Sequence, residues 1–259
     1  MSDRAPKISI RGLKKSFGRK EVLRGVDLDI DTGKSLVIIG GSGTGKSVLL
    51  RCILGLMPPD AGEILIDGVN IVKLSPFERA RRTRQIGMLF QGSALFDSLK
   101  VWENIAFRLI HSEGKPRAAS KKAAIERLAQ VGLPPEVAML SPSELSGGMQ
   151  KRVALARAIA ADPDILFFDE PTTGLDPITA DVINRLIVDR VKAVGATAIS
   201  ITHDMTSARK IADEIAMIHQ GRIVWRGGAD AIGDSGNPYV DQFVHGRAEG
   251  PIKMALKIT

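Results

Sequence analysis

The eight residues from Gly40 to Ser47 constrain this chain more than any other feature of its sequence. They are Gly40, Gly41, Ser42, Gly43, Thr44, Gly45, Lys46 and Ser47, with an apolar run before them and a helical pattern after them. This is the pattern of a phosphate-binding loop in its expected strand, loop, helix context. Glycines let several backbone N–H groups point at one anion, and the following helix adds the positive end of its dipole. We therefore expect Lys46 to contact the β and γ phosphates of ATP, and Ser47 to ligate Mg²⁺.

Hydrophobic periodicity around this loop predicts the fold class. Residues 8–30 alternate apolar and polar side chains, which is typical of half-buried antiparallel strands. Short apolar runs, typical of strands covered on both faces, lie at 35–39, 86–90, 165–168 and 196–201. Helical patterns separate the later runs, as expected of a parallel sheet with helices on its faces. We predict an α/β fold: a P-loop NTPase core with a mainly parallel sheet and an antiparallel β subdomain.

The middle and the end of the chain predict two further parts. Residues 101–161 are mostly helical in pattern, so we expect a helical subdomain at about 92–161. A hairpin is expected at 215–225, turning at Gln220 and Gly221. One nucleotide-binding domain then covers 1–246, and a C-terminal tail covers 247–259.

Polar residues follow three of the predicted strands, where an open parallel sheet binds its ligands. Asp169 and Glu170 come directly after the run 165–168. Asp169 would orient the magnesium shell, and Glu170 would polarise the attacking water as general base. Gln91 would hold Mg²⁺ or the lytic water, and His203 would contact the γ-phosphate. A lone histidine or glutamine is more often structural, so these two residues need support from elsewhere.

A second set of anion-binding groups precedes the helical stretch from Lys151. Ser146, Gly147, Gly148 and Gln150 offer N–H groups, a hydroxyl and a helix N-terminus. Taken alone, the pattern is equally that of an ordinary helix cap at Ser146.

The combined motifs resemble the ATPase subunits of ABC transporters over essentially the whole chain. The phosphate loop, Gln91, residues 145–150, residues 165–170, Gly174-Leu175-Asp176 and His203 occur in the family's order and spacing. The resemblance implies a head-to-tail homodimer in which Ser146 and Gly148 of one copy face the γ-phosphate on the other copy's Lys46. It also implies a switch role for His203, a link from Gln91 to an integral membrane permease, and communication across the pair by Asp176. Phe17 matches the position where the family stacks an aromatic ring on adenine; tyrosine is common there.

Two segments, residues 90–104 and 237–251, are similar to the MlaF-type ATPases of bacterial lipid-asymmetry and MCE-linked transport. That resemblance implies phospholipid transport, an MCE-domain protein and a small regulatory subunit as partners, and a place on the cytoplasmic face of the bacterial inner membrane. The helix expected at 240–244 would either pack on its own domain or let the last residues reach the other copy.

Composition is consistent with this interpretation and limits the alternatives. The net charge of +7 favours contact with polyanions. Because the cluster Arg79, Arg81, Arg82 and Arg84 has no interleaved aromatic residues, it favours a solvated basic face beside a membrane, and we expect no nucleic acid partner. No apolar run is long enough to span a bilayer or to serve as a signal peptide, and the single Cys52 suits the reducing cytosol.

Two other functions share parts of this pattern. The ATPase of a small-solute importer, for example for amino acids, has the same catalytic motifs and differs only in segments such as 90–104. A DNA-repair or chromosome-maintenance ATPase of this type needs a long coiled-coil insertion before Ser146, and none is present in the sequence.

Overall fold

The computed structural model describes residues 5–253. These residues form two compact units. The first unit holds the described residues up to 30, residues 36–73 and the described residues from 202 onward. The second unit holds residues 31–35 and 74–201.

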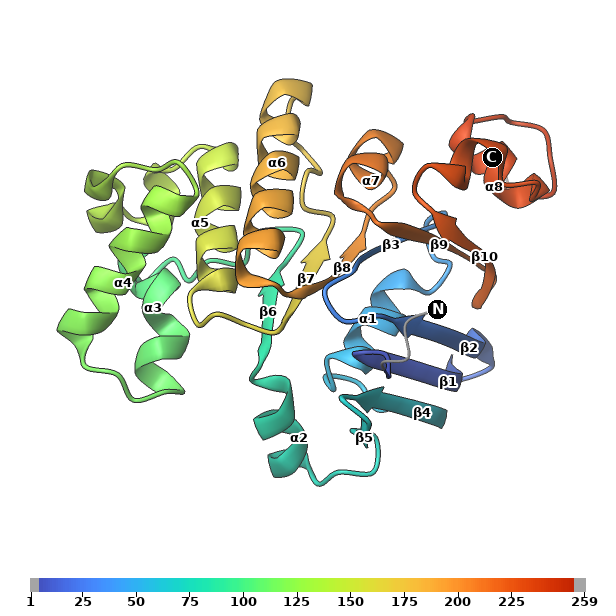
Figure 1. Ribbon diagram of the computed structural model, residues 1–259, viewed down its shortest axis with the longest axis horizontal. Helices are drawn as coiled ribbons and strands as arrows, with labels where there is room; N and C mark the ends of the chain where they lie inside the picture. Colours follow the sequence, from blue (N-terminus) through green and yellow to red (C-terminus); the bar gives the residue numbers. More distant parts are fainter. Residues whose placement is uncertain (1–4, 254–259) are drawn as a thin grey trace. The chain divides into compact units, whose positions relative to one another are not determined.

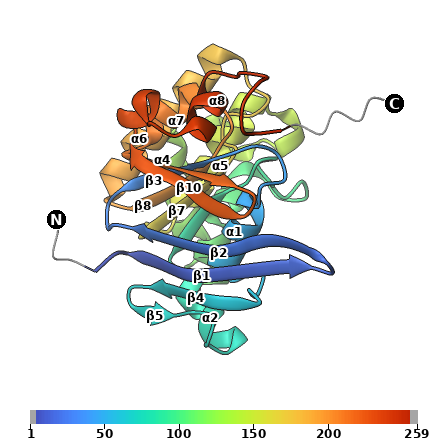
Figure 2. The same ribbon diagram turned by 90° about the vertical axis from the view of Figure 1, so that its right-hand side faces the viewer.

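An antiparallel sheet in the first unit contains β1 (Ile8–Phe17), β2 (Lys20–Ile30), β4 (Ala61–Ile66) and β5 (Val69–Asn70). The strand order is β2-β1-β4-β5, and Figure 2 shows these strands stacked side by side. Its apolar residues alternate as the sequence predicts, and Ile8, Ile10, Val26 and Ile64 are completely buried. The antiparallel prediction for 8–30 is therefore confirmed.

The first unit also carries the strand that leads into the phosphate loop. In β3 (Ser35–Ile39), residues from Leu36 on pair in parallel with β9 (Glu214–His219), which forms a hairpin with β10 (Arg222–Gly228). The Arg24 N–H on β2 donates to the Gly221 carbonyl at 2.9 Å and ties the hairpin turn to the antiparallel sheet. The predicted hairpin and its turn at Gln220 and Gly221 are confirmed.

The helical elements of the first unit follow these strands. They are α1 (Lys46–Ile53), α7 (Met205–Ile211), the 3₁₀ turn η3 (Ala231–Asp234) and α8 (Pro238–Val244). Cys52 lies on the buried side of α1, and burial raises the pKa of its thiol to about 11. The thiol is therefore a packed apolar group.

A parallel sheet and a cluster of helices form the second unit. The strands β6 (Ile86–Leu89), β7 (Ile165–Asp169) and β8 (Thr197–Ile201) lie in the order β8-β7-β6. The helices are α2 (Pro76–Thr83), α3 (Val101–His111), α4 (Arg117–Gln130), α5 (Gly147–Ile159) and α6 (Pro177–Val194), with 3₁₀ turns η1 (Pro135–Met139) and η2 (Pro142–Glu144). In Figure 1, α5 lies between the pair α3 and α4 on one side and α6 on the other. Helix α5 therefore contacts α3, α4 and α6 as well as strand β6.

The sequence did not predict every element. It missed β4, β5, α2 and α7, and strand β6 ends at Leu89, so Phe90 belongs to the following loop. Helix α2 and its C-cap residue carry the arginine cluster, and the helix has no buried residue, which agrees with a solvated basic face. No helix among residues 5–253 is long and apolar enough to cross a membrane.

Candidate functional site

The phosphate loop runs from the end of β3 to the start of α1, as predicted. Its glycines are required by space and by backbone geometry. Gly40 has φ +150°, and a Cβ there would lie 2.4 Å from the Ile218 carbonyl oxygen. Gly45 has φ +108°, and a Cβ there would lie 2.9 Å from Leu23 Cδ2. Only glycine fits both positions without a shift of the neighbouring chain.

Side chains of the loop donate to its own backbone, and the helix that follows begins uncapped. Lys46 Nζ donates to the carbonyls of Gly40 and Gly41 at 2.7 and 2.8 Å, and Thr44 Oγ1 donates to Gly41 at 3.0 Å. Ser42, Gly43 and Ser47 are exposed. Helix α1 begins without a side-chain cap and without an acidic residue in its first turn. Its N-terminal N–H groups therefore suit a phosphate.

Two more predicted residues belong to the first unit. Phe17 is 48% exposed at the end of β1, and Lys15 Nζ lies 5.8 Å from its ring centroid. His203 is exposed and follows Thr202, whose N–H donates to the Ile38 carbonyl on β3 at 3.4 Å. The backbone beside His203 is thus tied to the strand that leads into the phosphate loop.

The predicted carboxylates stand at the end of β7 in the second unit. Asp169 is the last residue of the strand, and Glu170 has the unusual φ of +49°. The Glu170 N–H donates to Ile201 at 2.9 Å, and Thr173 Oγ1 donates to Glu170 Oε2 at 3.0 Å. A left-handed glutamate is costly unless its surroundings hold it, and such strain is found mainly at functional sites.

The loop after β6 carries Gln91 and is braced by helix α5. Ser93 and Ala94 have φ values of +62° and +48°. Both of their carbonyls accept hydrogen bonds from the Arg157 guanidinium, each at 2.7 Å. The Gln91 side chain is exposed, so its amide is accessible to a ligand.

The second predicted anion site is the N-terminus of α5. Ser146 is its N-cap residue, and the Ser146 hydroxyl accepts a hydrogen bond from the Met149 N–H at 3.3 Å. Ser146 and Gly147 are exposed. Gly148 lies against α6, since a Cβ there would be 2.8 Å from Thr179 Cγ2. Gln150 donates to the carbonyls of Pro142 and Leu145 at 3.1 and 3.4 Å and so braces the approach to Ser146.

Asp176 caps α6 beside this helix start. Its carboxylate accepts the N–H groups of Ile178 and Thr179, each at 3.0 Å. Hydrogen bonds from Thr179 and Ile178 hold the pKa of Asp176 below its usual range. Because Gly148 and Asp176 both contact Thr179, the starts of α5 and α6 lie together.

The donor types fit magnesium better than a soft metal. Among residues 5–253 no group of three or more His, Cys, Asp or Glu could hold a metal ion. Ser47, Gln91 and Asp169 offer hydroxyl, amide and carboxylate oxygens. Mg²⁺ prefers a few such oxygens together with substrate phosphates and water.

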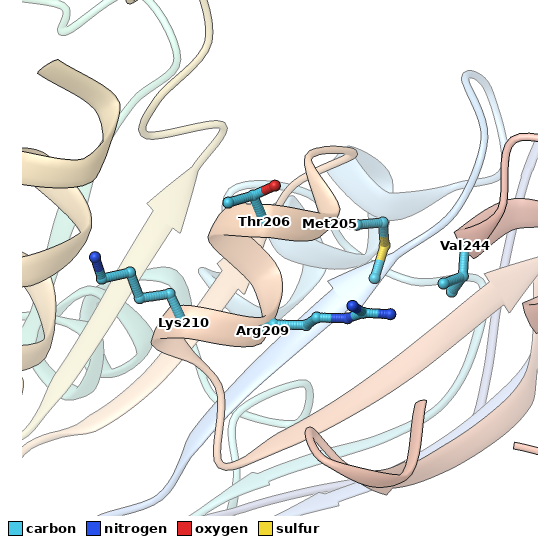
Figure 3. Close-up of a pocket in the computed structure, with 5 residues that line it drawn as sticks. All are labelled: Met205, Thr206, Arg209, Lys210 and Val244. Carbon is cyan, nitrogen blue, oxygen red and sulfur yellow. The ribbon is translucent and has the colours of Figure 1, made fainter. Parts of the chain in front are cut away.

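A separate cavity of about 360 Å³ lies in the first unit beside helices α7 and α8 (Figure 3). It is lined by Met205, Thr206, Arg209, Lys210 and Val244. None of the predicted site residues lines this cavity.

The described part of the tail folds back on α8. The Gln242 amide donates to the carbonyls of Arg247 and Ile252 at 3.2 and 3.1 Å, and its oxygen accepts the Ile252 N–H at 2.7 Å. Val240 on α8 is completely buried. The helix therefore packs on its own domain; residues 254–259 of the predicted tail lie outside the described residues.

Comparisons with known proteins agree with this arrangement. The sequence profile of the "ABC transporter" family matches residues 23–173. The chain is 40% identical to "Probable ribonucleotide transport ATP-binding protein mkl" of Mycobacterium leprae, over 96% of this chain and 71% of that protein. It is 39% identical to "Intermembrane phospholipid transport system ATP-binding protein MlaF" of Escherichia coli, over 95% of this chain and 91% of that protein.

A solved structure gives the same result for the fold. It is a dimeric ATP-binding cassette in a post-hydrolysis state bound to ADP and Pi, with a TM-score of 0.79 and 32% identity. The match covers 86% of this chain and 98% of that one. The predicted α/β nucleotide-binding fold is confirmed, and the chain belongs to the ABC transporter family as an ATP-hydrolysing subunit.

Proposed function

We propose that this ATPase drives phospholipid transport between membranes and works as a head-to-tail homodimer beneath an integral membrane permease. The observation that carries the choice of cargo is the similarity to MlaF, which extends over 91% of that protein. The mkl protein bears a ribonucleotide name at comparable identity, with 71% of its length covered. Residues 90–104 and 237–251 provide the sequence support for the MlaF type.

Each predicted residue has a proposed role in ATP binding. Phe17 stacks on adenine, and the N–H groups of residues 40–45 surround the phosphates while Lys46 supplies a full positive charge. Ser47, Gln91 and Asp169 would hold Mg²⁺, which would neutralise charge on the phosphate oxygens. These roles are consistent with the exposed hydroxyl of Ser47 and the uncapped N-terminus of α1.

The hydrolytic step assigns different tasks to two residues. Glu170 accepts a proton from the water that attacks the γ-phosphorus, and the bond from that phosphorus to the bridging oxygen of ADP breaks. His203 contacts the γ-phosphate and so registers its loss. The backbone of Glu170 is left-handed, and its carboxylate accepts a hydrogen bond from Thr173. Both features set the position of the carboxylate before it accepts the proton.

Pairing of two copies completes each site. The helix start of one copy faces the γ-phosphate bound to the other copy, and it consists of Ser146, Gly147, Gly148 and Gln150. Asp176 provides communication between the two ATP sites of the pair. Enclosing a triphosphate without compensating groups would cost roughly several kcal/mol per unpaired charge, so two opposed half-sites are favourable. Hydrolysis removes the phosphate that bridges them, and the pair opens.

The ATPase part of the proposal is tested with Glu170→Gln. The amide keeps the shape of the side chain but cannot accept the proton, so kcat is expected to fall by about 10²- to 10⁴-fold while ATP still binds. Light scattering should then detect a stable dimer in ATP and Mg²⁺. Turnover at the normal rate would exclude Glu170 as the base.

The cargo is tested by isolating the assembled complex from bacterial inner membranes. We expect the chain on the cytoplasmic face with a permease, an MCE-domain protein and a small regulatory subunit, and with co-purified phospholipid. Recovery of a solute-binding protein, without an MCE-domain protein, would instead support the small-solute importer.

A further inference from the structure

Lys151 is a buried cation in the second unit that the roles above leave unused. It lies in the second turn of α5, just after Ser146 to Gln150, and is only 5% exposed. Burying an ammonium group is costly unless its donors are satisfied. The contacts of the Lys151 ammonium group therefore indicate why a cation is present at this buried position.

The Lys151 ammonium contacts the backbone of two proposed site residues. Its Nζ donates a short hydrogen bond to the Gln91 carbonyl and a second one, at 3.4 Å, to the Glu170 carbonyl. Burial lowers the pKa of Lys151, and the negative charges of Asp169 and Glu170 act in the opposite direction. One side chain from α5 thus joins the loop after β6 to the end of β7.

Both backbone segments need such support because both contain unfavourable conformations. Glu170 has φ +49°, and its carbonyl also accepts a hydrogen bond of 3.3 Å from the Thr173 N–H. Ser93 and Ala94 are also left-handed and are held by Arg157, which lies on the same helix. Helix α5 therefore presents two cations to backbone carbonyls near the proposed site.

We infer that Lys151 is a positioning residue for ATP hydrolysis, which fixes the backbones of Gln91 and Glu170 together and couples both to the helix start at Ser146. The inference rests on the proposed roles of Gln91 and Glu170. Lys151 acts through the two carbonyls that it holds.

The test compares Lys151→Met with Lys151→Arg in the full chain. Methionine keeps an unbranched apolar stem but has no donor, whereas arginine keeps the charge and the donors. For Lys151→Met we expect kcat to fall about ten- to a hundredfold, the worth of a charged hydrogen bond. The KM for ATP and the Kd of a fluorescent ATP analogue should stay within about twofold, since the phosphate loop is unchanged. Lys151→Arg should recover much of kcat.

Hydrogen exchange on the nucleotide-free protein gives a second measurement that does not depend on activity. Lys151→Met should speed exchange at residues 91–94 and at 170–173, and leave α3 and α4 unchanged. The matched control is Arg127→Met, which removes a largely buried cation that pairs with Asp162 in the same unit. The control should change neither segment and keep turnover within about twofold.

Three results would overturn the inference. They are normal kcat in Lys151→Met, a rise in KM with kcat preserved, and faster exchange spread evenly over the second unit. Failure of the proposed function is distinguishable, because it would appear as normal turnover in Glu170→Gln whatever Lys151 does.

Discussion

At the scale of single residues, the phosphate loop is the part of the site that sequence predicts best. Its residue types are imposed by chemistry: glycine where φ is positive and a Cβ would collide, and lysine where charge is needed. The positions of Gly40 and Gly45 against Ile218 and Leu23 supply the steric reason. Such positions can be predicted from the sequence because no other residue type fits them.

Lys46→Ala tests the loop directly. Removing the ammonium group should weaken ATP binding by about ten- to a hundredfold, since charged hydrogen bonds to phosphate are lost. Equilibrium binding of a fluorescent ATP analogue measures the effect. Lys20→Ala, at an exposed position on β2, is the matched control and should bind normally. Equal affinities in the two variants would contradict the assignment.

The structure adds contacts that the sequence alone does not predict. Gln150 was predicted at the nucleotide, and in the structure its amide donates to the carbonyls of Pro142 and Leu145. Lys151 was not singled out because a lysine beside an arginine in a helix usually indicates a solvated face. Only its burial and its contacts with Gln91 and Glu170 distinguish it.

At the scale of elements, the strands with a clear apolar pattern were predicted, and β4 and β5 were missed. Strand β5 has only two residues, and β4 begins with Ala61 and Gly62, which have low strand propensity. Helix α2 did carry a signal: Ser75 and Glu78 form a capping box. The arginines that follow leave α2 without a buried face, so no apolar periodicity indicates the helix.

Helix α6 depends on its cap at Asp176, and this dependence is expected to vary with pH. The carboxylate has a lowered pKa in the folded protein, so its stabilising effect is present above its ordinary pKa of 3.8 and is lost as pH falls through the lower folded value. Asp176→Ala should therefore unfold at lower denaturant than the parent at pH 7, with the gap closing under strongly acidic conditions.

The control for this helix is Asp189→Ala, at an exposed position in its body. Denaturant unfolding followed by circular dichroism should show little change at pH 7 for the control. An equal loss of stability in both variants would mean that the charge on the helix, and not the cap, is responsible.

At the scale of the whole molecule, the proposed head-to-tail pair predicts complementation between two inactive variants. Lys46→Ala disables the loop, and Ser146→Arg disables the opposing helix start. In a mixed pair, both substitutions lie in one of the two ATP sites, and the other ATP site contains neither. ATPase activity should therefore return in part when the two purified variants are mixed.

Independent sites within single copies would give no such recovery. Mixing two preparations of the same variant is the matched control and should remain inactive. The experiment separates a shared site from a self-contained one without any assumption about cargo or permease.

The buried thiol of α1 has a practical consequence for watching such a pair move. Because the Cys52 thiol has a pKa of about 11 and the residue is 1% exposed, it should not react with maleimide or methanethiosulfonate reagents in the native protein. The native chain should therefore give no background signal when cysteine-directed labels are used for spectroscopy. A spin label on one added surface cysteine would report the spacing of two copies before and after nucleotide cleavage, with the native sequence otherwise intact.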